Sequence, residues 1–273
     1  MSDRTALMFD GSFDGLLTAI FEAYTLRPMP TEIIEPDSQQ HLGMVYRNVR
    51  TDAAKAARVR RGIRTQMGGE AYDNAWKAFL SQHPERGTFI YRYVRLGFQI
   101  KQQLVRSLTD ERVITVNKLA SLVAREASHL LQFVRLGETE TGVYYSEITP
   151  TYPVLPLIMP HFVHRLNTQA FVIYDKTHKQ AGLYNGRQWV LTDADNAQPP
   201  AYTAEERQYR QLWKTFYDTV AITERTASIS SETSAQPAKN SPVKSSTQVL
   251  PSIRTDSSFV PWGIQFFKPL LPS

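Results

Sequence analysis

The sequence predicts an α+β fold in which an antiparallel sheet packs against several helices. Strand-like runs at residues 171–175, 180–186 and 187–193 follow one another with turn signals between them, as in an antiparallel meander. Apolar residues at helical spacing occupy much of the chain before this region, and they return over residues 202–226. Helices packed against such a meander make an α+β arrangement.

The length of 273 residues is enough to bury a substantial core, so we expect one large domain or one domain with an appendage. No apolar run approaches the roughly 20 residues that cross a bilayer, and the N-terminus lacks the basic-then-apolar pattern of a signal peptide. We therefore expect no membrane contact and a cytoplasmic location.

The sequence contains no cysteine. This absence excludes disulfides, cysteine-ligated zinc, iron–sulfur clusters and a thiolate nucleophile. Chemistry that needs a cluster must therefore come from a partner. The net charge of +5 permits a polyanionic ligand, because net charge acts on association rather than on the fold.

The first predicted strand, residues 6–10, leads through a glycine turn into a helix. Ser12 is placed to cap that helix, because its hydroxyl can accept a hydrogen bond from a backbone N–H of the first turn. A strand that delivers Asp10 and Ser12 to a helix start can form an anion site, although Asp10 would repel a phosphate. The alternative is that both residues only cap the helix. Residues 27–38 contain three prolines and are expected to be irregular.

The stretch 47–64 is strongly basic and contains a single acid, Asp52. We expect a helix from about Thr51, with Thr51 as its cap. Helical geometry places three of its arginines on one broad face, and such a face can neutralise phosphates through counterion release. The alternative is a solvated surface that pairs with acids elsewhere. The predicted nucleic-acid contacts are Arg47, Lys55, Arg58, Arg61 and Arg64.

Further helices are predicted at residues 70–82, 88–107 and 111–126. The second mixes aromatic and basic residues, a combination that can bind single strands by charge and base stacking. A core-facing aromatic stripe with a basic outer face explains the same pattern. The last predicted helix, residues 202–226, is expected to bury Tyr209, Leu212, Trp213, Phe216 and Val220.

Before the meander, the chain reads as strand, turn, strand, proline-containing loop and a helix that opens at Pro160. The two strands, residues 130–136 and 142–150, suggest an antiparallel pair. Arg135 and Glu147 lie on these adjacent strands, where they can form a cross-strand ion pair.

The helix at Pro160 carries His161, His164 and Arg165. Two histidines three residues apart can begin a metal site, but no carboxylate completes a known pattern, so we predict no metal and no cofactor. A structural role and contact with a substrate or phosphate are the alternatives. The catalytic candidates, if the chain has a reaction of its own, are Asp10, His161 and Arg165.

Three segments resemble one bacterial protein family: MFDGSFDGLLTAIFEAY at residues 8–24, PVLPLIMPHFVHR at 153–165 followed by FVIYD, and YRQLWKTFYDTVAITER at 209–225. That family is the radical-SAM-associated DNA-metabolism proteins, whose domain has no assigned function and is fused in some relatives to one resembling uracil-DNA glycosylase. The resemblance implies a DNA repair or modification setting and a radical-SAM partner, but no catalytic residue. The lack of cysteine fits the partner role, because a radical-SAM enzyme needs cysteines to hold its cluster.

We expect residues 1–226 to form a single α+β domain and residues 227–273 to form a low-complexity tail. Residues 227–258 are rich in Ser, Thr, Ala and Pro, which favours disorder, and an aromatic segment follows at 259–272. Members of the resembled family commonly end with a basic-aromatic segment instead. A tether with a docking peptide, a lineage-specific tail and a shifted reading frame each explain this departure.

Three functional hypotheses follow. The first is a DNA-binding accessory protein that works with a radical-SAM partner. The second is a nucleic-acid-processing enzyme with a site near Asp10, His161 and Arg165. The third is a protein–protein adaptor that docks through residues 259–272.

Overall fold

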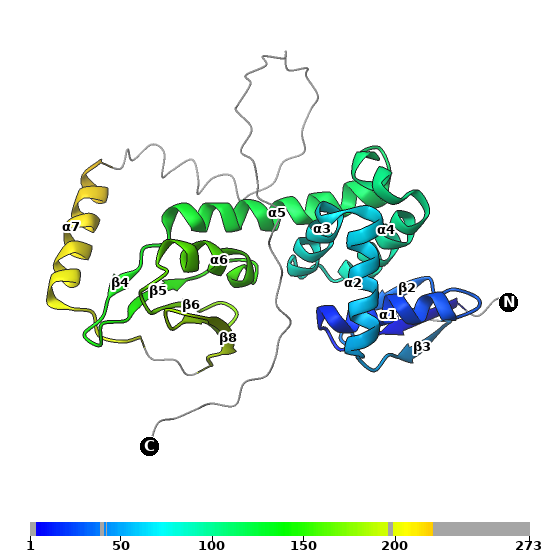
Figure 1. The fold of residues 1–273 in the computed structure, drawn as a ribbon, viewed down its shortest axis with the longest axis horizontal. Helices are drawn as coiled ribbons and strands as arrows, with labels where there is room; N and C mark the ends of the chain where they lie inside the picture. Colours follow the sequence, from blue (N-terminus) through cyan, green and yellow to red (C-terminus); the bar gives the residue numbers. More distant parts are fainter. Residues whose placement is uncertain (1–3, 39–40, 42, 196–198, 221–273) are drawn as a thin grey trace, which may run out of the picture. The chain divides into compact units, whose positions relative to one another are not determined.

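The computed structural model describes residues 4–38, 41, 43–195 and 199–220, and it confirms the α+β fold (Figure 1). These residues form seven α-helices, one 3₁₀-helix and two sheets, of three and five strands. The chain divides into two compact units, Met1–Phe216 and Tyr217–Ser273, and of the second the structure describes only the end of a helix. No helix in the described ranges combines the length and the apolar character needed to cross a membrane.

A parallel sheet of three strands forms from the N-terminal part of the chain. Its order is β2 (Glu32–Ile34), β1 (Arg4–Met8) and β3 (Met44–Asn48). The strand predicted at residues 6–10 is confirmed as β1, two residues earlier. The expectation that residues 27–38 are irregular is wrong at β2, where Ile33 pairs with Leu7. A strand of three residues between prolines is too short to show the alternation that identifies a strand in sequence.

Two helices follow the C-terminal ends of these strands and pack against each other (Figure 1). α1 (Phe13–Thr25) follows β1, and α2 (Ala53–Met67) follows β3. Both bury an apolar stripe, which includes Leu16, Leu17 and Ile20 on α1 and Val59 and Ile63 on α2. The two helix starts therefore lie at the same edge of the sheet, because the strands that deliver them are parallel.

The next elements are helices. They are α3 (Gly69–Leu80), α4 (Arg86–Ile100), the 3₁₀-helix η1 (Lys101–Arg106) and α5 (Glu111–Phe133). Among them, α4 packs against β2 of the first sheet. The helix predicted at residues 70–82 is confirmed as α3. The helix predicted at residues 88–107 is confirmed up to Ile100, where α4 ends and η1 begins. Tyr91 and Tyr93 of α4 are buried, so most of its aromatic residues serve the core.

The strand predicted at residues 130–136 is wrong, because α5 continues through Phe133. Leu130 and Leu131 lie three and four residues after the buried Ala127 and pack against the core, so they prolong the apolar stripe of the helix. α5 also packs against a later helix, α6. Tertiary burial has overridden the local strand propensity.

The second sheet has the order β4-β5-β6-β7-β8 and is mostly antiparallel. Its strands are β4 (Gly137–Glu138), β5 (Tyr144–Ile148), β6 (Phe171–Asp175), β7 (Gln180–Tyr184) and β8 (Trp189–Asp193). The predicted meander is confirmed for β6, β7 and β8. The neighbouring pair β5–β6 is instead parallel, and a helix makes the crossover between them.

That crossover helix, α6, spans Leu155–Arg165 and contacts β7 and β8. The prediction that it opens at Pro160 is wrong by one and a half turns. Ile158, Met159 and Phe162 are buried at helical spacing, which places the start of the helix before Pro160. Gly182 of β7 lets it approach closely, since an added Cβ would lie 2.4 Å from the Met159 Sδ.

The last described helix, α7, spans Ala204–Val220 and confirms the predicted helix in part. Tyr209 and Leu212 are 63% and 65% exposed, so the expectation that they are buried is wrong. The other three residues expected in that stripe belong to the part of α7 whose side chains are not described. The predictions for the tail, including the aromatic segment at 259–272, lie outside the described residues.

Candidate nucleic-acid interface

The start of α2 differs by one residue from the prediction. Asp52, not Thr51, is the N-cap, and its carboxylate accepts hydrogen bonds from the backbone N–H groups of Ala54 at 2.8 Å and Lys55 at 3.1 Å. Thr51 instead donates its hydroxyl to the Asp10 Oδ2, at 2.7 Å. An acidic cap is favoured at this position, because its negative charge lies at the positive end of the helix dipole.

The buried side of α2 determines which of its cations face solvent. Ala56, Val59, Ile63 and Met67 are buried, so residues on the opposite side of the helix point outward. Arg58 and Arg61 lie on that outward side, and both are exposed. They remain at the surface because α2 buries only its opposite stripe.

Two flanking cations of α2 are neutralised by acids from α1. The Lys55 ammonium lies 2.5 Å from the Glu22 carboxylate, and the Arg60 guanidinium pairs with Asp14. The alternative of a surface that pairs with acids elsewhere is therefore realised for these two residues. Lys55 belongs to the predicted contact set, but its ion pair with Glu22 already neutralises part of its charge.

The remaining arginines of the basic stretch have no carboxylate partner among the described residues. These are Arg47, Arg50, Arg58, Arg61 and Arg64. Arg58 lies over the Phe21 ring at 5.6 Å, and Arg64 lies over the Tyr72 ring at 4.2 Å. A cation–π contact positions a guanidinium without cancelling its charge. The face therefore presents several positive charges that an anion can neutralise.

Aromatic side chains border this basic face on the side of α1 and α4. Tyr24 of α1 and Phe98 of α4 meet edge to face, with ring centroids 5.8 Å apart. Phe98 lies against α2 at Gly62, where an added Cβ would be 3.2 Å from its ring. Burial raises the pKa of Tyr24 to about 12, so its hydroxyl stays protonated and neutral. Together with Phe21, these rings place apolar surface beside the unpaired arginines.

Asp10 lies in the turn after β1 and serves as an acceptor for two neighbouring hydroxyls. Its Oδ1 accepts from the Ser12 hydroxyl at 2.6 Å and from the Ser12 N–H at 3.0 Å, while its Oδ2 accepts from Thr51. Burial opposes ionisation, but these hydrogen bonds outweigh it and hold the pKa of Asp10 below its usual range. The Ser12 hydroxyl in turn accepts from the Gly15 N–H at 2.9 Å, which confirms its capping role.

The other two catalytic candidates lie on a different element. His161 and Arg165 are exposed on α6, as is His164, and α6 packs against the second sheet rather than the first. Within the described ranges, no hydrogen bond, ion pair or ring contact joins Asp10 to either residue. No group of three or more His, Cys, Asp or Glu side chains suited to hold a metal ion occurs in the same ranges. The structure thus shows no assembled centre from these candidates.

The predicted ion pair between Arg135 and Glu147 is wrong. Arg135 follows α5 rather than lying on a strand, and its guanidinium pairs with Glu206 of α7 at 3.2 Å. Glu147, on β5, pairs with Lys176 at 3.3 Å and accepts from the Tyr145 hydroxyl at 3.1 Å. The error follows directly from the strand that was expected in place of the end of α5.

Comparison with known families matches residues 84–237 to a family described as a domain of unknown function, DUF4130. The chain belongs to this family. No curated protein matches the sequence. The DUF4130 match begins two residues before α4 and continues past the described end of α7, so α2 lies on its N-terminal side. The aromatic border at Phe98 falls within the match, and the unpaired arginines precede it.

Proposed function

We propose that this DUF4130 chain is a nucleic-acid-binding accessory protein of DNA repair or modification, and that α2 is its binding element. The observation that carries the proposal is the set of arginines on and before α2 that have no carboxylate partner among the described residues. Like charges on one face repel one another, and an anion that meets them relieves this repulsion.

The arrangement favours a polyanion over a single small anion. Arg58 and Arg61 lie about one turn apart on the outward side of α2, and Arg47 precedes the helix on β3. Each phosphate that such a cation neutralises releases condensed counterions, so several spaced cations act together on one strand. The aromatic border of Phe21, Tyr24 and Phe98 adds surface on which bases can stack.

A radical-SAM partner is the second part of the proposal. The family resemblance of the sequence motivates it, and the lack of cysteine supports it, since this chain has no thiolates to hold an iron–sulfur cluster. In this division of roles the partner performs the chemistry, and the present chain holds the nucleic acid. Co-purification of the full chain with a radical-SAM protein of the same organism tests this part, and separate elution at moderate salt contradicts it.

Fluorescence anisotropy with labelled single-stranded and duplex DNA tests the binding itself. We expect binding at low salt that weakens steeply as salt is added, because the contacts are made to phosphates. Absence of binding at low salt to either form would overturn the proposal and leave α2 as a solvated surface.

A further inference from the structure

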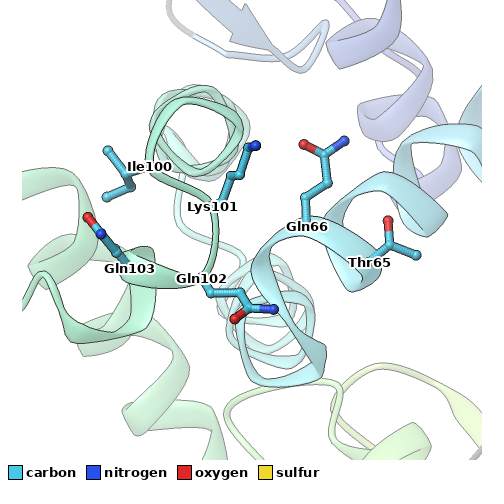
Figure 2. Close-up of a pocket in the computed structure, with 6 residues that line it drawn as sticks. All are labelled: Thr65, Gln66, Ile100, Lys101, Gln102 and Gln103. Carbon is cyan, nitrogen blue, oxygen red and sulfur yellow. The ribbon is translucent and has the colours of Figure 1, made fainter.

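A pocket of about 550 Å³ lies where the end of α2 meets the junction between α4 and η1. Figure 2 shows that the amides of Gln66, Gln102 and Gln103 point away from one another around it. No two of these three amides therefore meet one edge of a ligand, and the pocket does not select a class of ligand.

The stronger candidate for an interaction surface is β8, the strand at one edge of the second sheet (Figure 1). It pairs with β7 on one side, and in the described ranges no strand pairs with its other side. Val190 and Leu191 of this strand are 42% and 39% exposed. Natural edge strands usually avoid further pairing through prolines, bulges or lysines. The stretch Trp189–Asp193 has none of these, so its edge is open to another strand.

The hydrogen bonds to β7 show which backbone groups of β8 face outward. At one end of the pair, the Asn185 N–H donates to the Gln188 carbonyl at 3.3 Å. At the other end, the Ala194 N–H donates to the Lys179 carbonyl at 2.8 Å. Bonded and unbonded positions alternate in an antiparallel ladder, so every second residue from 188 to 194 bonds to β7. The residues between them, whose N–H and C=O groups face away from β7, are Trp189, Leu191 and Asp193.

The sequence of this edge is complementary to itself in one antiparallel register. When two copies of β8 meet with Val190 opposite Val190, Trp189 lies opposite Leu191 on either side of the centre, so apolar residues meet apolar residues. The outward backbone groups of Trp189 and Leu191 then face each other and can exchange hydrogen bonds. Val190 falls between them at an unbonded position, where opposite side chains lie closest.

Opposite charges meet at the two ends of the same register. Arg187 lies three residues before Val190 and Asp193 three residues after it, so each Arg187 is placed opposite Asp193 of the second copy. Both side chains are exposed, and neither has an ion-pair partner in the part of the chain that the structure describes. A register centred on Leu191 instead places Trp189 opposite Asp193. Charge and apolar matching therefore both favour the register centred on Val190.

We propose that the protein forms a symmetric dimer in which the β8 strands of two copies pair antiparallel around Val190. The pairing joins the two five-stranded sheets into one continuous sheet. A two-fold axis fits this contact, because each copy offers the same edge and the edge is complementary to itself. The dimer goes beyond the proposed function and does not depend on DNA binding.

Sedimentation velocity of the full chain over a range of concentrations tests the dimer. We expect a monomer–dimer equilibrium in the micromolar range, because a single strand pair is a small interface. We expect Val190→Lys to abolish the dimer, since it places like charges directly opposite each other. The matched control is Val45→Lys, because Val45 is 43% exposed on β3, an edge strand of the first sheet. This control is expected to dimerise as the wild type does.

Two results of this experiment would overturn the proposal. A wild type that stays monomeric at every concentration would show that a second copy is not the occupant of the β8 edge. A Val190→Lys variant that dimerises as tightly as the wild type would show that the contact between copies does not involve β8.

Exchange of the two charges tests the register while the apolar contact stays unaltered. Arg187 and Asp193 lie about 20 Å apart along one strand, so within a single copy solvent and salt largely screen them from each other. We expect Arg187→Glu and Asp193→Lys each to raise the dimer dissociation constant about tenfold, because each places like charges opposite one another. The variant with both substitutions is expected to dimerise about as tightly as the wild type. If it instead weakens the dimer as much as the two single changes together, the register around Val190 is wrong.

Discussion

The Thr51 hydroxyl donates to the Asp10 carboxylate at 2.7 Å, and this bond joins the turn after β1 to the residue before the cap of α2. Both residues lie just beyond the ends of neighbouring parallel strands. The contact is therefore one of the bonds that hold the basic helix against the first sheet. It also explains why Gly15 is needed, since an added Cβ there would lie 2.1 Å from the Asp10 Oδ1.

Replacing Asp10 by Asn tests this bond. Its pKa in the folded state is depressed by hydrogen bonds from Ser12 and Thr51, so its contribution to stability is present above the unfolded pKa and is lost as pH falls through the folded pKa. We expect Asp10→Asn to lower the free energy of unfolding by about 1 kcal/mol at neutral pH. Urea unfolding should show that the two proteins converge in stability as the pH falls through the lowered pKa of Asp10. A constant difference at all pH values would contradict an ionised Asp10.

Gly87 tests the placement of the short strand β2. An added Cβ would lie 2.4 Å from the Ile33 carbonyl oxygen, which is backbone and cannot rotate away. We expect Gly87→Ala to destabilise the fold by about 1–3 kcal/mol, measured by urea unfolding. Gly69→Ala is the matched control, because it also lies in the first turn of a helix and its Cβ would meet nothing within 4 Å. Equal stability of the two variants would place α4 away from β2.

The strands and helices that could be predicted from sequence are those whose own pattern is long enough to read. Turn signals separate the three strands β6, β7 and β8, and α4 has a long apolar stripe. The predictions of these strands and of this helix are confirmed. β2 was missed because three residues show no period. The end of α5 was mistaken for a strand because its packing partner, α6, is distant in sequence.

The candidate site shows the same division between local and distant information. A count of charges along 47–64 identifies Arg58 and Arg61, since local helical geometry is enough to place them outward. It cannot show that Lys55 and Arg60 meet acids of α1, which lie more than 30 residues away.

Glu22 offers a test of whether local rather than net charge governs binding. Its carboxylate neutralises Lys55, so Glu22→Gln frees a cation at the edge of the basic face. We expect tighter binding of single-stranded DNA and a salt slope steeper by about 0.7, the value for one further phosphate contact. Glu111→Gln removes the same charge from the start of α5 and is the control. If both variants strengthen binding equally, only net charge matters and α2 has no special role.

The salt dependence of single-stranded DNA binding by Arg58→Ala/Arg61→Ala/Arg64→Ala tests the central claim most directly. The comparison variant is Lys118→Ala/Arg125→Ala/Lys176→Ala, which removes three exposed positive charges from other parts of the chain. If α2 contacts the phosphates, the first variant binds more weakly and the magnitude of its salt slope falls by about 2, while the second behaves nearly as the wild type. Unchanged affinity and slope in the first variant, or equal losses in both, would contradict the assignment of α2 as the binding element.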